Sequence, residues 1–202
     1  MRFLSNPSTG RMGFAIARAA RTMGHDVTLV AGPVSLRTPK GVRRVDVISA
    51  RDMLKAVEKE DFDCLIATAA VADWRPDRCA NRKLKKHQMA NELRLVRNPD
   101  ILKTVSRKAR RAEGARHKVL VGFAAETGDP TVEALRKCRE KHLDLIVAND
   151  VTEAKCGFGT KTNRVTFAWV DGKVEHLPLM TKEAVARRLV KETAALFSPN
   201  RR

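Results

Sequence analysis

Apolar and polar positions follow two alternating periods along this chain. Segments with helical spacing of apolar residues are separated by short apolar runs rich in β-branched residues, as expected for strands. The run CLIATAAVAD at 64–73 is almost continuously apolar, which is typical of a central strand in a parallel sheet. The predicted helices are 13–22, one after Ser49, one after Asn98, 130–142 and 182–196, and the predicted strands are 26–32, 42–49, 64–73, 92–98, 119–127 and 143–150, with a β-hairpin within 163–179.

Local signals predict where several of these elements begin or end. Gly24 follows the first helix in the position of a C′ glycine. Ser49 and Asp52 have the spacing of a capping box. Asn98 is predicted to cap the helix that follows it, with 99–100 in its first turn.

This order of elements predicts an α/β fold. Alternating strands and helices favour a Rossmann-like, mainly parallel sheet with helices on both faces, and the hairpin adds a C-terminal antiparallel extension. A chain of 202 residues can form one good hydrophobic core, so we expect a single domain over 1–202.

Polar residues gather where the predicted strands end. Asp73, Asn98, 126–127 and 149–150 all follow strands, and small residues precede most of them. One such residue alone is more often a turn or cap residue. Ligands bind at the carboxyl ends of strands in open α/β sheets, so several polar groups at one edge predict a binding site.

The charge of the chain favours an anionic partner. The net charge is +17, and the basic residues are spread along the chain rather than gathered in one tail. Lys137 and Lys141 share one face of a predicted helix, where they either grip a triphosphate or form a solvated face. The basic group at 82–86 either lies over a phosphate or is a nucleic-acid patch or a solubility feature.

The turn before the first helix predicts a second place for an anion. Ser8, Thr9, Gly10 and Gly13 precede or open that helix, so backbone N–H groups and a helix N-terminus can bind a negatively charged substrate group. The turn is neither a P-loop nor the GxGxxG dinucleotide fingerprint. It partly resembles the turn of short-chain dehydrogenases, but those enzymes use a catalytic tyrosine and this chain contains no Tyr.

Other classes of protein are disfavoured by composition. The four cysteines lack CxxC spacing and the five histidines are scattered, which disfavours a zinc site or a disulfide framework. No apolar run approaches the ~20 residues that span a bilayer, and no signal peptide is visible. We therefore expect a soluble, cytoplasmic protein that binds no membrane.

Six motifs in order resemble phosphopantothenoylcysteine synthetase, the ligase half of the bacterial bifunctional enzyme of coenzyme A synthesis. They are SNPSTGRMG at 5–13, AAVADWRP at 69–76 with KLKK at 83–86, RNPDIL at 97–102, VGFAAET at 121–127, LDLIVAND at 143–150 and FGTKTNRV at 158–165. The resemblance runs from about Phe3 to the C-terminal helix.

The resemblance implies a ligase reaction. The carboxylate of 4′-phosphopantothenate attacks the α-phosphate of CTP and releases pyrophosphate, and the amine of L-cysteine then attacks the acyl cytidylate to give the amide and CMP. Both anionic substrates need cations, so the resemblance also implies Mg²⁺ as the divalent cofactor.

The resemblance also assigns roles to individual residues. It implies that Asn6 holds the acyl cytidylate and that Lys83 serves the second half-reaction. It also implies that Asn149 contacts pantothenate or phosphate, with Ser8, Thr9 and Gly10 on the same substrate side. CTP is assigned to Ala69, Ala70, Asp73, Pro99, Asp100, Ile101, Leu102, Phe123, Lys137 and Lys141, with Asp73 also a candidate metal ligand.

Three further expectations follow from the family. The loop at 75–86 is similar to a flap that closes over the site, and the family works as a homodimer. The flavin decarboxylase half is not visible in this sequence, so we expect no FMN here and a decarboxylase that is either a separate or a fused partner. A strand that precedes the opening turn in the family is also not visible, and we expect poor stability or activity without roughly 15 further upstream residues.

Two alternative functions are kept. A nicotinamide-dependent reductase on a similar sheet is disfavoured by the missing fingerprint and the missing Tyr. A basic nucleic-acid-binding domain is disfavoured because only 4% of residues are aromatic and no specific RNA or DNA module is recognisable.

Overall fold

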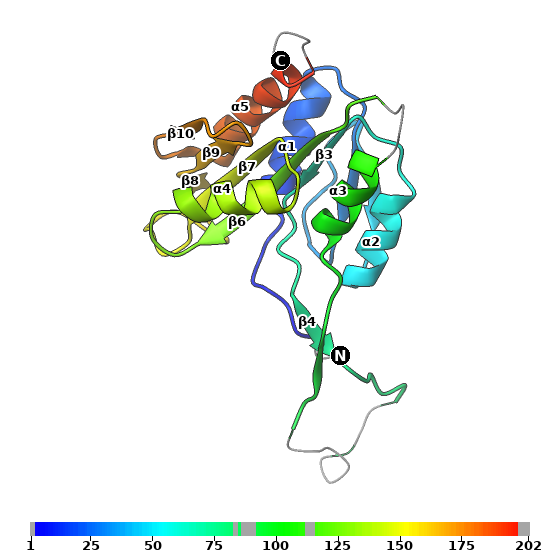
Figure 1. The fold of residues 1–202 in the computed structure, drawn as a ribbon. Helices are drawn as coiled ribbons and strands as arrows, with labels where there is room; N and C mark the ends of the chain where they lie inside the picture. The colour runs from blue at the N-terminus through cyan, green and yellow to red at the C-terminus, as the bar shows by residue number, and fades with distance from the viewer. Residues whose placement is uncertain (1–2, 83–84, 86–91, 112–115, 198–202) are drawn as a thin grey trace.

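The computed structural model describes residues 3–82, 85, 92–111 and 116–197. Helices and strands alternate along the chain as the sequence predicts (Figure 1). The helices are α1 (Arg11–Thr22), α2 (Ala50–Glu58), α3 (Ile101–Arg111), α4 (Thr131–Glu140) and α5 (Lys182–Ala195). The strands are β1 (Thr28–Ala31), β2 (Arg43–Asp46), β3 (Cys64–Ala67), β4 (Trp74–Pro76), β5 (Leu95–Arg97), β6 (Val119–Glu126), β7 (Leu145–Asp150), β8 (Thr162–Asn163), β9 (Thr166–Trp169), β10 (Val174–His176) and β11 (Met180–Thr181).

The largest sheet has five strands in the order β10-β9-β7-β6-β3. β3, β6 and β7 are parallel, and β9 then pairs antiparallel with β7. The predicted α/β fold with a mainly parallel sheet is therefore confirmed, and so is the antiparallel extension. The hairpin of β9 and β10 is not a separate appendage, because it continues the same sheet.

Helices cover both faces of this sheet, and each face has its own hydrophobic core. On one face, α1 and α5 lie side by side over residues such as Val121, Val147 and Phe167 (Figure 1). On the other face, α4 packs over a second cluster of buried residues, which includes Leu120 and Ile146. β6 and β7 contribute to both cores because successive side chains of a strand point to opposite faces.

The predicted helix ends are confirmed at two of three places. Gly24 follows α1 with φ +89°, as a C′ glycine does. Ser49 and Asp52 form the capping box of α2. The prediction for Asn98 is wrong, because α3 begins at Ile101 and the Asp100 carboxylate accepts the backbone N–H of Lys103 at 2.9 Å.

The predicted strand at 92–98 does not belong to the parallel sheet. Its ordered part, β5, pairs antiparallel with β4, so the two strands form a separate ribbon. Figure 1 shows β4 projecting from the body of the molecule. The alternating pattern correctly predicts a strand, but its sheet partner comes from the segment just after β3.

The parallel part of the fold is divided into two sheets. β1 and β2 pair only with each other within the described chain, and the large sheet ends at β3. The expectation that 64–73 forms a central strand is therefore wrong for the described residues, where β3 is an edge strand of only four residues. A groove of about 1440 Å³ is lined by residues of both β1 and β3 and by the apolar face of α1. The strand expected before the opening turn stays a prediction, and this groove is the space that such a strand would fill.

Among the described residues, every helix is too short or too polar to cross a bilayer.

Candidate functional site

The turn that opens α1 lines a small pocket. Gly10 adopts φ +77° before α1, and no described side chain caps this helix N-terminus. Its first N–H groups are therefore available for a ligand. The pocket has a volume of about 130 Å³ and is lined by Ser8, Thr9, Gly10, Arg11, Met12, Gly13, Thr68, Ala69, Ala70, Phe123, Ala124, Ala125, Asn149, Val151, Gly157, Phe158, Gly159, Asn163 and Lys182.

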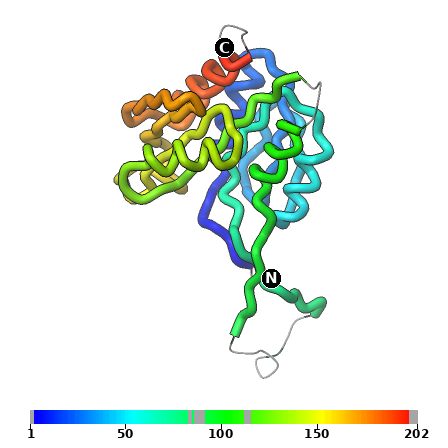
Figure 2. Tube along the Cα trace, in the orientation of Figure 1, coloured from blue at the N-terminus to red at the C-terminus, as the bar shows by residue number. Residues whose placement is uncertain are grey.

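Asn6 lies beside this pocket rather than in its wall. Its Nδ2 donates to the carbonyl oxygen of Ala70 at 3.0 Å, across 64 positions of sequence. This hydrogen bond connects the opening segment to the chain that follows β3. Figure 2 traces that segment into α1. The amide of Asn6 is exposed and so remains reachable for a ligand.

The chain after β3 is held by the end of β5. The backbone N–H of Asn98 donates to Asp73 O at 2.7 Å, and Asn98 Nδ2 donates to Ala72 O at 2.8 Å. Arg75 Nη1 in turn donates to Asn98 Oδ1 at 3.3 Å. Asn98 is thus a brace between two loops, which explains why its side chain does not cap α3.

Most of the residues assigned to the nucleotide line the larger groove. Its wall includes Ala69, Asp73, Pro99, Asp100, Ile101, Leu102, Phe123 and Lys141. Ala69 and Phe123 also line the small pocket, so the two spaces meet at these residues. Ala70 lines only the small pocket of the two.

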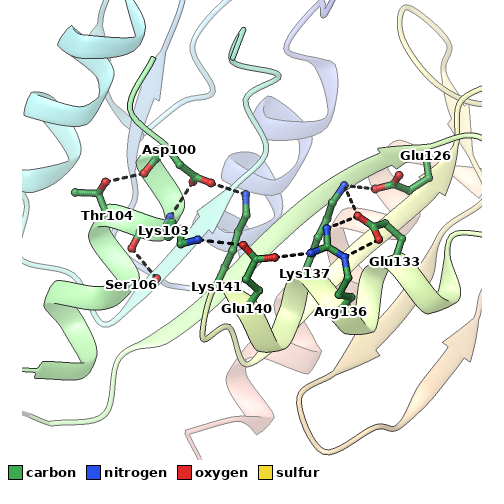
Figure 3. Close-up of polar contacts among 10 residues, drawn as sticks. All are labelled: Asp100, Lys103, Thr104, Ser106, Glu126, Glu133, Arg136, Lys137, Glu140 and Lys141. Atoms are coloured by element: carbon green, nitrogen blue, oxygen red, sulfur yellow. Dashed lines mark hydrogen bonds and ion pairs between the residues drawn. The ribbon is translucent and has the colours of Figure 1, made fainter. Parts of the chain in front are cut away.

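The two lysines of the predicted helix face both engage carboxylates. Lys137 Nζ lies 2.5 Å from Glu126 Oε1 and 3.4 Å from Glu133 Oε1, and Lys141 Nζ lies 2.9 Å from Asp100 Oδ2. Figure 3 shows these contacts as part of one chain of ion pairs along α4 and the start of α3. Both lysine side chains are thus ion-paired and partly exposed, at 29% for Lys137 and 27% for Lys141. Lys141 lines the groove, whereas Lys137 lines neither space.

Neighbouring charges in this network of ion pairs favour the ionised forms of Asp100 and Lys137. Burial opposes the ionisation of Asp100, but the hydrogen bonds from Lys141 and the Lys103 N–H, with the charges of both lysines, lower the pKa of that carboxyl. Burial likewise opposes the charge of Lys137, but the hydrogen bond and charge of Glu126, aided by Glu133, raise the pKa of that amine. Lys137 is therefore a cation at neutral pH.

The described residues hold no cluster of three or more His, Cys, Asp or Glu side chains that could ligate a metal ion. Mg²⁺ commonly uses one or two carboxylates together with substrate phosphates. Asp73 and Asp100 line the same groove and suit only that mode. Burial raises the pKa of the Cys64 and Cys138 thiols to about 12, so neither is a nucleophile at neutral pH.

Lys182 and Asn163 are among the residues of the small pocket that sequence reasoning missed. They line it together with the predicted Ser8, Thr9, Gly10 and Asn149. Asn163 belongs to a motif quoted above, but nothing in its spacing indicated which chain segment it would face. Lys83 lies outside the described residues.

Comparison with known proteins places the chain in a family. The sequence model described as "DNA/pantothenate metabolism flavoprotein C-terminal domain" matches residues 1–196. The coenzyme A biosynthesis bifunctional protein CoaBC of Vibrio vulnificus strain YJ016 is 44% identical over 201 residues, which are 98% of this chain and 49% of that protein. The protein of the same name from Bacillus subtilis strain 168 is 45% identical over 199 residues, 97% of this chain and 48% of that protein.

Solved structures agree with these sequence matches. A crystal structure of the C-terminal domain of CoaBC superposes with a TM-score of 0.77 and 40% identity, over 97% of this chain and 87% of that one. A DNA/pantothenate metabolism flavoprotein from Streptococcus pneumoniae shares the fold, with a TM-score of 0.76 at 20% identity over 94% of this chain and 89% of that one. The chain spans about half the length of the curated relatives it matches.

Proposed function

Because this chain belongs to the family of the DNA/pantothenate metabolism flavoprotein C-terminal domain, we propose that it is a phosphopantothenate–cysteine ligase of coenzyme A biosynthesis. The finer proposal is that CTP activates the carboxylate of 4′-phosphopantothenate and that L-cysteine accepts the acyl group. The family match favours this reaction over a nicotinamide-dependent reductase or a nucleic-acid-binding domain.

One geometric observation carries the proposal. A small pocket built around a helix N-terminus and a larger groove meet at Ala69 and Phe123. A ligase of this kind must bring two anionic substrates end to end, and the reacting carboxylate and α-phosphate have to meet between their binding places. The junction of the two spaces supplies such a point.

The chemistry proceeds in two substitutions. A carboxylate oxygen of phosphopantothenate forms a bond to the α-phosphorus of CTP, and the bond from that phosphorus to the pyrophosphate oxygen breaks. The amine nitrogen of cysteine then bonds to the acyl carbon, and the carbon–oxygen bond to CMP breaks. The amine gives up a proton to solvent, so the products are the amide, CMP and pyrophosphate.

Residues of this chain would lower the activation barriers of both substitution steps by stabilising negative charge on the substrates. Asn6 would donate an amide N–H to the acyl cytidylate once it releases the Ala70 carbonyl, 3.0 Å away. Lys141 and Lys137 add positive charge on the side of the triphosphate, and Lys83 is proposed for the cysteine step. Asp73 and Asp100 would hold a Mg²⁺ that arrives with CTP and screens the negative charge of its phosphates.

The decisive experiment is a reconstitution of the reaction. Purified protein is mixed with phosphopantothenate, Mg²⁺ and either CTP or ATP, with and without L-cysteine, and pyrophosphate and amide are measured. We expect pyrophosphate with CTP in both cases, amide only with cysteine, and little of either with ATP. Equal use of ATP would contradict the nucleotide assignment, and no turnover with any nucleotide would contradict the ligase.

Two proposals concern partners. We expect a homodimer, which light scattering coupled to gel filtration measures directly. We also expect a decarboxylase as a separate or fused partner, and the word "bifunctional" in the names of the relatives supports such a pairing.

A further inference from the structure

Lys182 is a buried cation at the start of α5. Only 5% of the residue is exposed, and its Nζ donates to the Gly157 carbonyl oxygen at 2.9 Å. It forms no ion pair with any carboxylate in the described part of the chain. Burial, together with the charge of Arg11, lowers the pKa of the amine, and the charge of Glu183 offsets this effect only in part.

Asn163 also lines the small pocket. It is 5% exposed, and its Oδ1 has no hydrogen-bond partner among the described residues. Backbone hydrogen bonds fix the two residues relative to each other, since β8 pairs with β11 and the Lys182 N–H donates to Lys161 O at 3.0 Å. A buried amide with a free oxygen, beside a buried amine whose hydrogen bond goes to a neutral carbonyl, indicates a polar ligand rather than a closed core.

Other parts of the pocket lining also suit an anion. The uncapped N-terminus of α1 contributes to the lining, together with Ser8 and Thr9. Asn149 also lines the pocket and is 9% exposed. The pocket volume of about 130 Å³ is on the order of ten times that of a single water site, enough for a tetrahedral phosphate group.

We propose that Lys182 is a specificity-determining residue that binds the phosphate group of the acyl substrate in the small pocket, while Asn163 Oδ1 accepts a hydrogen bond from a neutral part of the same substrate. The substrate's other anionic end, its carboxylate, would then point toward Ala69 and Phe123, where the nucleotide groove begins. The neutral backbone of the substrate offers hydroxyl and amide donors for the free oxygen of Asn163. This inference rests on the proposed function, because it takes phosphopantothenate as the ligand.

The test compares variants that separate charge from packing. Lys182→Met keeps most of the stem and removes the charge, and Lys182→Arg keeps the charge. We expect Lys182→Met to raise the KM for phosphopantothenate about 10- to 100-fold with little change in the KM for CTP. Lys182→Arg should recover part of that loss. Lys161→Met, at an exposed neighbouring position, is the matched control and should behave like the unaltered protein.

A binding measurement keeps the test independent of turnover. Thermal melting is followed with phosphopantothenate or with pantothenate, which lacks the phosphate. Phosphopantothenate should raise the Tm of the unaltered protein well above the effect of pantothenate, and Lys182→Met should abolish that difference. The ligand-free Tm of Lys182→Met should not fall, because the variant removes an unpaired buried charge.

The outcomes separate this inference from the proposed ligase. A fall in the ligand-free Tm with an unchanged KM would make Lys182 only a support for the Gly157 loop and would overturn the inference, while the ligase would stand. A phosphate-dependent Tm shift that needs Lys182, without any CTP turnover, would support the pocket and sink the ligase. If Lys182→Met fails to fold, Asn163→Asp replaces it, since a new negative charge of the same shape should expel the phosphate.

Discussion

At the scale of single residues, the ion pairs of α4 distinguish two neighbouring cations. Lys137 and Arg136 both contact Glu133, but Lys137 also contacts Glu126 at the end of β6, whereas Arg136 reaches Glu140 (Figure 3). Lys137 is therefore the one that faces the strand end, where the nucleotide is proposed to bind.

This difference gives a prediction for Lys137→Met. The variant should weaken CTP binding by about 1–3 kcal/mol if the amine exchanges a carboxylate for a phosphate oxygen. Arg136→Met removes a cation from the same helix and should change CTP affinity little. Isothermal titration with CTP measures both values. If the two variants bind CTP with equal affinity, Lys137 has only a structural role.

Asp100 gives a prediction about pH. Its pKa is lowered in the folded state, so its ionised form stabilises the fold above the unfolded pKa of about 4, and this contribution is lost as the pH falls through the folded value. Asp100→Asn keeps a good helix cap but removes the charge that Lys141 binds. It should therefore cost up to about 1 kcal/mol at pH 7.

The same variant should cost little at low pH. Urea unfolding at constant ionic strength, at pH 7 and near pH 2, measures the change. Asp26→Asn is the control, because Asp26 is fully exposed in its pair with Arg21 and should alter stability little at either pH. A pH-independent loss for Asp100→Asn would indicate that packing, not charge, is responsible.

Residue identity alone predicted some of these roles and not others. Ser49 and Asp52 were correctly predicted as a capping box, because the signal lies within four consecutive positions. Asn98 was misassigned because its partner, Ala72 O, lies 26 positions away. Lys182 was overlooked because a lysine in the first turn of a helix carries no local sign that a distant segment will bury it.

At the scale of elements, the approach of α1 to β3 depends on one glycine. A Cβ atom at Gly13 would lie 2.7 Å from Thr68 Oγ1, closer than such atoms come in proteins. Both residues line the small pocket and the groove. The glycine therefore lets the helix N-terminus reach the strand end where the two spaces meet.

Gly13→Ala should displace α1 and destabilise the protein by about 1–3 kcal/mol, as overpacking usually does. Adding Thr68→Ala removes the clashing oxygen and should restore most of that stability. Chemical denaturation of the two single variants and the double variant measures the coupling. If the two substitutions change the free energy of unfolding additively, the clash of the new Cβ with Thr68 is relieved by a movement elsewhere.

The pattern of apolar and polar residues predicted well which segments form strands and helices, but it did not predict which strands pair with each other. The strand at 92–98 was expected beside the parallel strands, since its alternation fits any half-buried strand. Its pairing with β4 depends on Trp74, Arg75 and Pro76, which lie outside every predicted strand, the last two in the loop at 75–86 that was expected to be a flap. Which edges meet is set by the whole chain, not by the strand itself.

At the scale of the whole molecule, the candidate site is assembled from distant parts of the chain. The small pocket joins the turn at 8–13 to Asn149, Gly157, Asn163 and Lys182. Motifs near the two ends of the sequence therefore line the same pocket. The sequence predicted the turn at 8–13 from its local chemistry, but the position of Asn163 and Lys182 depends on the pairing of β8 with β11, which no local pattern indicates.

The division of the sheet leads to the last prediction. β6 and β7 have strand partners on both sides, whereas β1 and β3 each have one partner among the described residues and border the same groove. An edge without a partner leaves alternate N–H groups open to water. In hydrogen exchange we expect amides of β6 and β7 to exchange only through global unfolding, and those on the groove side of β1 and β3 to exchange faster by orders of magnitude.

The amides of β9 are an internal control, because β9 also has partners on both sides. Equal protection of β1, β3 and β6 would contradict open edges and would show that something covers the groove in solution. If that protection weakens on dilution, the cover is a second copy of the chain. If it is independent of concentration, the cover belongs to the same molecule, as the expected additional strand would.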